Sequence, residues 1–232
     1  MFDTLQNDIQ CVKDRDPACR NTLEVLFCYP GFRAVRAHRL AHFLHTHGMK
    51  FLARLVSEWC RFCTGVDIHP GAVIGKRLFI DHAQGVVIGE TSVVGDDVTL
   101  YQGATLGGTG KETGKRHPTV GNHVTVSAGA AVLGPLTVGD YAKVGAGAVV
   151  LSDVPRFATV VGVPGHVVRI NGCPVQCGAD CACAPGEPCP KAAEKEGEAG
   201  VDLDQVHLPD PVQQQIQALT VRIAALEKHV VQ

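Results

Sequence analysis

The chain has 232 residues, of which 21 are Lys or Arg and 23 are Asp or Glu, so its formal net charge is −2. This length predicts one compact domain with appendages, and the near-neutral charge gives no reason to expect a nucleic-acid partner. No apolar run reaches about 18 residues, so we expect no membrane-spanning segment. The polar start, MFDTLQNDIQ, does not resemble a signal peptide. The ten cysteines are therefore expected to stay reduced in the cytoplasm.

Residues 1–66 are predicted to form a helical domain, because apolar residues recur in them at helical spacing. We expect Asp16 to cap the second helix and Pro17 to be its first residue. Pro30 is expected to end that helix, and Gly48 to end the third, with a fourth helix after it.

Two groups of possible ligands lie in this helical part. His38, His42 and His45 recur at helical spacing, and imidazoles at i and i+4 can share a metal ion. No further ligand is evident, so a polar helix face is the simpler interpretation. Cys60 and Cys63 form a CxxC pair, but no strand precedes it, and redox function is not expected there.

A six-residue repeat dominates the middle of the chain. An aliphatic residue recurs at every sixth position, apart from one two-residue slip and one polar loop at 107–119. The series is Ile68, Ile74, Ile80, Ile88, Val94, Leu100, Leu106, Val120, Val126, Val132, Val138, Val144 and Val150. Such a repeat predicts a parallel β-solenoid, in which three sixes form one triangular coil and the aliphatic residue points inward. An alternating β-sandwich would show period two instead.

The other repeat positions are also regular. Glycine often occupies the second position of each six, and we expect it to turn the corners, where positive φ is needed. The fifth position is small or aliphatic, as a narrow stacked core requires.

Function is expected where the sequence departs from the repeat. Asp67 and His82 are closer in sequence than the three sixes of one coil, so we expect them on adjacent coils near one corner. A carboxylate behind an imidazole fixes its tautomer and stabilises the imidazolium, which suits a general base acting on a hydroxyl group. The loop at 107–119 carries glycines and basic residues, as an anion-binding site requires.

These departures lie in motifs that resemble those of the serine O-acetyltransferases, a family of hexapeptide-repeat acyltransferases. The motifs are RDPA at 15–18, VDIHPGAVIG at 66–75, DHAQGVVIGET at 81–91, TLGGTGK at 105–111, RHP at 116–118 and GVPG at 162–165. The resemblance covers roughly residues 1–171 and is to the shorter bacterial form, without an extra amino-terminal helical extension. It implies an α+β fold, in which an amino-terminal helical domain precedes a left-handed parallel β-helix. That hand is opposite to the one usual for parallel crossovers.

The resemblance implies transfer of acetyl from acetyl-CoA to the hydroxyl of L-serine, giving O-acetyl-L-serine and CoA in the first step of cysteine biosynthesis. By motif position, His82 is the expected general base and Asp67 its partner. The expected substrate-binding residues are Asp16 and Asp81 for the ammonium group, Arg116 for the carboxylate and His117 in the lining.

Acetyl-CoA is the expected co-substrate, and no metal ion is expected. The expected CoA contacts are Gly108, Thr109, Ala128, Gly129, Gly145 and Ala146, with Lys143 near a phosphate. The family implies a homotrimer or a dimer of trimers with active sites between subunits, and feedback inhibition by L-cysteine. Family members often end in Ile and insert into cysteine synthase, so the terminal Gln232 makes that complex unexpected here.

The predicted organisation is a helical domain at 1–66, a catalytic β-helix at 67–170, a linker at 171–208 and a helix at 209–232. The linker is expected from its proline, glycine and charge content. Its cysteines, which fit either a metal or redox-sensing site or a reduced, mobile segment, are Cys173, Cys177, Cys181, Cys183 and Cys189. Apolar steps of four and three in 209–232 predict a short coiled coil or docking helix.

Three alternative functions remain open at the level of sequence. One is a hexapeptide acyltransferase acting on a sugar or drug hydroxyl, against which Asp16 and Asp81 argue, because a neutral sugar needs no carboxylates. Another is a zinc lyase of the carbonic-anhydrase type with His69, His82 and His117 as ligands. The third is a catalytically idle scaffold that regulates cysteine synthase, against which the intact Asp–His pair argues.

Overall fold

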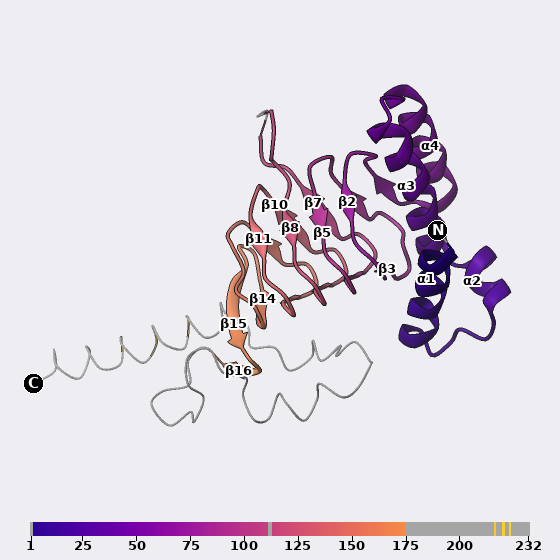
Figure 1. Ribbon diagram of the computed structural model, residues 1–232. Helices are drawn as coiled ribbons and strands as arrows, with labels where there is room; N and C mark the ends of the chain where they lie inside the picture. Colours follow the sequence, from indigo (N-terminus) through magenta and orange to yellow (C-terminus); the bar gives the residue numbers. More distant parts are fainter. Residues whose placement is uncertain (1, 111–112, 175–215, 217–219, 221–222, 224–232) are drawn as a thin grey trace, which may run out of the picture.

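The computed structural model describes residues 2–110 and 113–174, together with Ile216, Thr220 and Ile223. Helices pack at one end of a three-sided stack of short strands (Figure 1). Their bounds are Phe2–Arg15 for α1, Thr22–Cys28 for α2, Pro30–Thr46 for α3 and Lys50–Thr64 for α4.

The start of α2 differs from the prediction. The helix is capped by Asn21, whose side chain accepts a hydrogen bond from the backbone N–H of Glu24 at 2.9 Å. Asp16 instead lies in the turn after α1, where its carboxylate accepts a hydrogen bond from the backbone N–H of Ala18. Pro30 begins α3 rather than only ending α2, because the first turn of a helix does not need its missing N–H.

The strands form three faces, which we call sheets A, B and C, and the pairing is parallel except at the last two strands of sheet C. Sheet A contains β1 (Asp67–Ile68), β4 (Val87–Ile88), β7 (Thr105–Gly107), β10 (Ala131–Leu133) and β13 (Val149–Val150). Sheet B contains β2 (Val73–Ile74), β5 (Val93–Val94), β8 (Thr119–Val120) and β11 (Thr137–Val138). Sheet C contains β3 (Phe79–Ile80), β6 (Thr99–Leu100), β9 (Thr125–Val126), β12 (Lys143–Val144), β14 (Ala158–Val161), β15 (His166–Ile170) and β16 (Cys173–Pro174). The chain visits A, B and C in turn, so each circuit is one coil.

The aliphatic series fills the interior as predicted. Every member belongs to one core cluster, and all except the half-buried Ile74 are fully buried. The small fifth-position residues, such as Ala72, Ala104 and Ala148, have no exposed surface, and the larger Leu78 and Leu136 are buried, at 5% and 7% exposed. Each buried Val, Leu or Ile side chain contributes about 1.5–3 kcal/mol relative to exposure, so the stacked interior is the main source of stability.

The expected role of the second-position glycines is wrong in one respect. These glycines do not have positive φ; a Cβ on Gly95 would lie 2.8 Å from the backbone of Gly121 in the next coil. They are therefore required by the close approach of stacked coils. Positive φ falls at the fourth position instead. At the corner between sheets B and C the residues there are Arg77, Asp97, His123, Tyr141 and Phe157, with φ between 56° and 59°.

Coil length varies where the repeat is interrupted. Asp67 pairs with Val87, so the first coil takes 20 residues, whereas Val87 pairs with Thr105 after 18. The two extra residues lie in the turn between β3 and β4, at the predicted slip. Thr105 pairs with Ala131 after 26 residues, because the loop at 107–119 projects from the stack (Figure 1). At the far end β15 pairs antiparallel with β14, an arrangement that the six-residue repeat does not predict.

The helices close the first coil. The side chains of Cys11 and Val12 on α1 pack with Phe79 on the outer face of β3, and burial raises the pKa of the Cys11 thiol to about 11. Ala34 and Val35 of α3 join the interior of the β-helix itself. The helical domain and the stack therefore share two apolar clusters, one inside the β-helix and one on the outer face of β3.

The histidines of α3 do not form the solvent-facing polar surface expected from their spacing. His38 is 5% exposed, and the Nδ1 atom of His42 lies 2.8 Å from the carbonyl oxygen of Pro70. They lie where α3 meets the first coil. Cys60 and Cys63 are free, as are Cys11, Cys19 and Cys28.

The outer surface of α4 is markedly apolar. Four large side chains one helical turn apart are exposed, and we call them the α4 row: Phe51, Leu55, Trp59 and Phe62. Within the described residues, no helix is both long and apolar enough to cross a membrane.

The tail falls mostly outside the described residues. The linker cysteines from Cys177 to Cys189 lie outside them, and so does most of 209–232. The residues described there, Ile216, Thr220 and Ile223, are helical, and the hydroxyl of Thr220 donates to the carbonyl oxygen of Ile216 at 2.8 Å.

Candidate active site

The turn between β3 and β4 carries the predicted base. The backbone N–H of His82 donates to the Asp81 carboxylate at 2.9 Å, and the Nε2 atom of His82 lies 3.7 Å from the other carboxylate oxygen. His82 and Ala83 both have positive φ, at 55° and 58°. This left-handed pair makes the turn that absorbs the two extra residues, and it leaves 69% of the His82 side chain exposed.

Asp67 lies beside this turn on the preceding coil. It begins β1, and its backbone N–H donates to the carbonyl oxygen of Val86, the residue before β4, at 2.9 Å. The polar contact of the His82 ring is with Asp81, and the two described side chains of Asp67 and His82 form no hydrogen bond with each other. The backbone places the two residues on adjacent coils at one corner, while their pairing remains a proposal.

Arg116 and His117 lie at the end of the long loop and are held by β4–β5 residues that the sequence analysis did not identify. The Arg116 guanidinium forms an ion pair with Glu90, which lowers the pKa of that carboxyl. The Thr91 hydroxyl accepts hydrogen bonds from the backbone N–H groups of Arg116 at 3.0 Å and His117 at 3.1 Å. Glu90 and Thr91 are the last two residues of the DHAQGVVIGET motif, so that motif could have indicated that they belong to the site.

The imidazole of His117 is almost buried and has a defined tautomer. Its Nδ1 atom accepts a hydrogen bond from the backbone N–H of Thr91 at 3.2 Å, so the proton of the neutral ring is on Nε2. Burial, and then the Arg116 charge, lower the pKa of His117. A Cβ on Gly89 would collide with this ring. The ring is thus seated on a glycine of the preceding coil.

Lys115 locks the same end of the loop. Its Nζ atom donates to the carbonyl oxygens of Thr91 at 2.7 Å and Pro118 at 3.2 Å. Burial lowers the pKa of this ammonium group. The loop therefore returns to the stack in a fixed position.

Asp16 is held beside the stack by the helical domain. The hydroxyl of Tyr29 donates to its carboxylate at 2.5 Å. Burial, and then the Asp16 carboxylate, raise the pKa of Tyr29. Arg15, the last residue of α1, contacts the start of β6 through Thr99, and the backbone N–H of Asp81 donates to Leu100 of the same strand. Asp16, in the turn after α1, thus follows a residue that contacts β6 of sheet C, and Asp81 is hydrogen-bonded to the same strand.

The predicted site residues divide between two edges of one chain. Asp81 and His82 lie at the edge where sheet C passes into sheet A. Arg116 and His117 lie at the edge where sheet A passes into sheet B. A single chain therefore does not bring the base to the arginine.

The predicted CoA residues divide in the same way. Those on the edge of His82 are Ala128, Gly129, Gly145 and Ala146, whereas Gly108 and Thr109 begin the loop on the edge of Arg116, and Lys143 begins β12 on sheet C. Gly129 has a φ of 67° and open space where a side chain would be. Gly145 is instead required by packing, since a Cβ there would lie 2.8 Å from Val161.

The proposed zinc ligands are divided too. His69 and His117 lie at the A–B edge and His82 at the C–A edge. Among the described residues, no three His, Cys, Asp or Glu side chains are grouped so that they could hold a metal ion.

Comparison with known proteins identifies the family. The family model described as "Serine acetyltransferase, N-terminal" matches residues 1–37. A serine acetyltransferase of Staphylococcus aureus is 47% identical over 219 residues, which cover 94% of this chain and 92% of that protein. The chain belongs to the serine acetyltransferase family. A second serine acetyltransferase, from Mycobacterium tuberculosis, is 55% identical over 168 residues, covering 72% of this chain and 73% of that protein.

Solved serine acetyltransferase structures confirm the fold class, helices followed by a left-handed parallel β-helix. The Neisseria gonorrhoeae enzyme superposes with a TM-score of 0.71 at 45% identity, over 72% of this chain and 66%, just under two thirds, of that chain. The Brucella abortus enzyme, described as a complex with coenzyme A, superposes with a TM-score of 0.72 at 45% identity, over 74% of this chain and 69% of that chain.

Proposed function

We propose that the chain transfers acetyl from acetyl-CoA to the hydroxyl of L-serine, giving O-acetyl-L-serine and CoA, with His82 as the general base. The observation that carries the proposal is the match to a serine acetyltransferase over nearly the whole of both chains. Solved relatives are described in complexes with serine, with cysteine and with coenzyme A. The reaction is the first step of cysteine biosynthesis.

The chemistry assigns a proton path to His82. A serine hydroxyl is a weak nucleophile until a base takes its proton as the new bond forms. The His82 ring takes that proton while the serine oxygen attacks the thioester carbonyl. When the tetrahedral intermediate breaks its C–S bond, the imidazolium returns the proton to the departing CoA thiolate. Asp67 on the adjacent coil would stabilise the imidazolium by its charge.

The remaining site residues would recognise the amino acid. The carboxylates of Asp16 and Asp81 suit the ammonium group, and the Arg116 guanidinium suits the carboxylate in a bidentate pair. In the free chain Glu90 occupies that guanidinium, so a bound serine would share Arg116 with Glu90 or displace it. The Nε2–H of His117 would donate a hydrogen bond to a substrate oxygen.

We propose that the complete site lies between subunits of a homotrimer. The support is the division of the site residues between two edges, because a neighbouring chain could present its A–B edge to the C–A edge of the first. CoA would then lie along the small residues Ala128, Gly129, Gly145 and Ala146, with Gly108 and Thr109 from the facing edge and Lys143 near a phosphate. The α4 row suits a second interface and would join two trimers.

Regulation and compartment are proposed on the same basis. L-cysteine differs from L-serine by one atom and would compete for the same site as a feedback inhibitor. The free cysteines of the described residues suit a reducing cytoplasm. Gln232 lies outside the described residues.

Thiol release from acetyl-CoA, measured with and without L-serine, tests the proposal. The wild type should release thiol only with serine, and His82→Asn should lose at least about a hundredfold in kcat/KM, as expected for a general base. Asn suits this test because it tolerates the positive φ at this position. Serine-independent release, or full activity in the variant, would remove the proposal. His166→Gln, on the exposed start of β15, is the matched control and should keep wild-type rates.

A further inference from the structure

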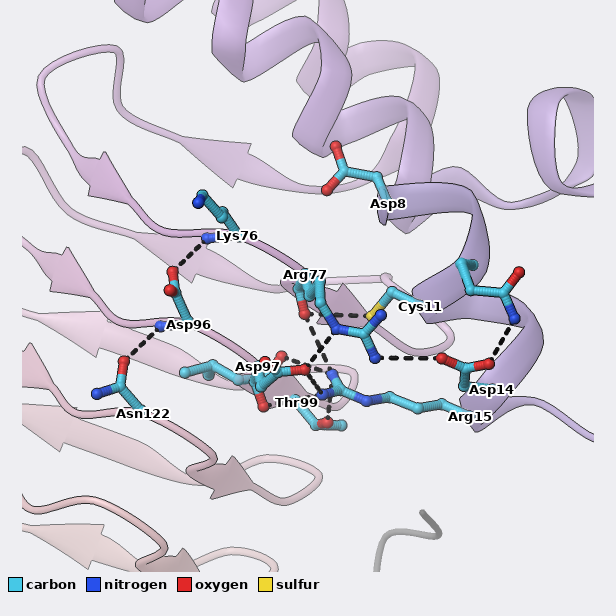
Figure 2. A network of polar contacts seen from close by, with 12 residues as sticks. Asp8, Cys11, Asp14, Arg15, Lys76, Arg77, Asp96, Asp97, Thr99 and Asn122 are labelled. Atoms are coloured by element: carbon cyan, nitrogen blue, oxygen red, sulfur yellow. Dashed lines mark hydrogen bonds and ion pairs between the residues drawn. The ribbon is translucent and has the colours of Figure 1, made fainter. Parts of the chain in front are cut away.

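The carboxyl end of α1 is fixed to the β-helix by one side chain. The Arg15 guanidinium is only 9% exposed and donates to five acceptors, all of them on the stack (Figure 2). Its Nη1 contacts the carbonyl oxygens of Arg77 at 3.3 Å and Val98 at 3.2 Å and the Thr99 hydroxyl at 3.2 Å. Its Nη2 contacts the carbonyl oxygen and the carboxylate of Asp97, both at 3.0 Å.

The residues that accept these hydrogen bonds lie at a corner of the stack and are themselves held in place by further contacts. Arg77 and Asp97 occupy the strained fourth position at the B–C corner, where both have positive φ. The Asp97 carboxylate oxygen that meets Arg15 also accepts from the Nε of Arg77 at 2.7 Å, and Arg77 reaches Asp14 of α1 at 3.2 Å. In Figure 2 the two arginines converge on Asp97 from the helix and from the corner.

The next residue after the contact is Asp16. Its backbone N–H closes α1 on the carbonyl oxygen of Val12 at 2.9 Å, so the chain direction at Asp16 follows from where Arg15 is fixed. From the other side, Tyr29 holds the carboxylate. Arg15 acts on the main chain and Tyr29 on the side chain, and both constrain one carboxylate.

The fixed point is also close to Asp81. Arg15 meets Thr99, the first residue of β6, and the second residue of that strand, Leu100, accepts from the backbone N–H of Asp81. The next residue of the chain is Tyr101. Burial raises the pKa of its hydroxyl, the Asp81 charge raises it further, and the Arg15 charge lowers it. Arg15 therefore joins the Asp16 segment to the strand that supports Asp81.

We propose that Arg15 is a positioning residue for serine binding: by fixing the end of α1 to β6 and the B–C corner, it sets the separation of the Asp16 and Asp81 carboxylates. This inference rests on the proposed function, in which those two carboxylates bind the substrate ammonium group. A displacement of about 1 Å in a binding group can cost as much as a hundredfold in rate, so the effect of losing Arg15 should fall on serine and not on CoA.

The test compares Arg15→Gln and Arg15→Lys with Arg77→Asn. Arg15→Gln should raise the KM for serine by at least about tenfold while the KM for acetyl-CoA stays within about twofold, and Arg15→Lys should recover part of the loss. Arg77→Asn removes the neighbouring arginine from the same corner, with a residue that tolerates its positive φ. Because the Arg15 side chain and its acceptors remain, this variant should lower the melting temperature and raise the serine KM by less than Arg15→Gln does.

A double-variant cycle separates positioning from general destabilisation. In an Asp16→Asn background, Arg15→Gln should add less than about threefold to the serine KM, because residues that act through one another are not additive. Full additivity, an unchanged serine KM in Arg15→Gln, or equal rises in both KM values would overturn the role of Arg15. Absence of serine-dependent thiol release in the wild type would instead overturn the proposed function. If Arg15→Gln fails to fold, the Arg15→Lys variant carries the same comparison.

Discussion

At the scale of single residues, His38 has an unusual environment. It is almost fully buried at the contact between α3 and the first coil, and its Nδ1 atom has no hydrogen-bond partner in the described structure. Burial, with smaller effects of the neighbouring His42, Arg39 and His69 charges, lowers its pKa to about 3, opposed by a backbone hydrogen bond to Ala72. The side chain is therefore neutral in the folded protein.

The pH dependence of stability follows from this neutral histidine. In the unfolded chain His38 has a pKa of about 6.5, so between about pH 3 and 6.5 the unfolded state binds one more proton than the folded state. Stability should be complete above about pH 6.5 and fall by up to about 1.4 kcal/mol per pH unit below it. Urea unfolding of wild type and His38→Leu at pH 5 and 7 measures this.

His38→Leu should lose less stability than wild type between pH 7 and 5. His69 and His117, whose pKa values are also lowered, chiefly by burial, should keep some of the slope in the variant. Equal slopes in wild type and His38→Leu would contradict the assignment.

At the scale of elements, the corner between sheets B and C carries a column of stacked rings. His123 and Tyr141 stack with centroids 4.6 Å apart, and Tyr141 and Phe157 with centroids 4.9 Å apart, both nearly parallel. Arg156 lies over the last ring at 5.5 Å. All three stacked residues have positive φ, so ring stacking offsets the backbone cost of these corners.

Substitution of Tyr141 tests that account. Tyr141→Asn keeps a residue that tolerates positive φ but removes two stacked pairs, and should cost about 1–3 kcal/mol of unfolding free energy. Tyr141→Ala should cost about 1 kcal/mol more, because alanine is strained in this backbone conformation. Urea unfolding measures both, with serine-dependent activity at low temperature as the control. Identical stabilities for the two variants would rule out backbone strain at the corner.

The sequence predicts which residues face the interior of the coil. It predicts neither the residues with positive φ at the corners nor the contact that joins α1 to the coil. The inward series from Ile68 to Val150 follows from periodicity alone, because burial repeats every six residues. The corners could not be predicted in this way, since Arg77 and Tyr141 are not typical of positive φ and are stabilised by distant side chains. The Arg15 contact joins residues up to 84 positions apart in sequence, as far as Thr99, and the local sequence pattern contains no signal for it.

For the candidate site, too, the sequence predicted residues but not the contacts between segments distant in sequence. The motifs indicated which residues to expect, including His82 and Arg116. They did not indicate that Glu90 pairs with Arg116, or that one chain holds His82 and Arg116 on different edges. Both facts depend on how the coils stack in space.

At the scale of the whole molecule, that division allows a complementation test. His82→Asn and Arg116→Gln homomers should each be nearly inactive. If each site takes His82 from one chain and Arg116 from the next, every trimer that contains both variants should have one intact site of its three, with about a third of wild-type activity.

Co-expression of the two variants with different affinity tags, followed by purification through both tags, provides the mixed oligomers. Purified homomers mixed without co-expression are the control and should stay inactive unless subunits exchange. Mixed oligomers with no activity above that of the homomers would show that each site is built within one chain.

The division of the site residues between two edges also makes catalytic activity depend on subunit association, whereas folding of the single chain does not. The interior of each β-helix is filled by its own aliphatic residues and closed by helices of the same chain, so we expect an isolated chain to stay folded. If serine contacts its general base only where two β-helices meet, dilution would dissociate the subunits and abolish activity while every chain remained folded. Specific activity would then report on subunit association, and a spectroscopic measure of folding would not register the loss.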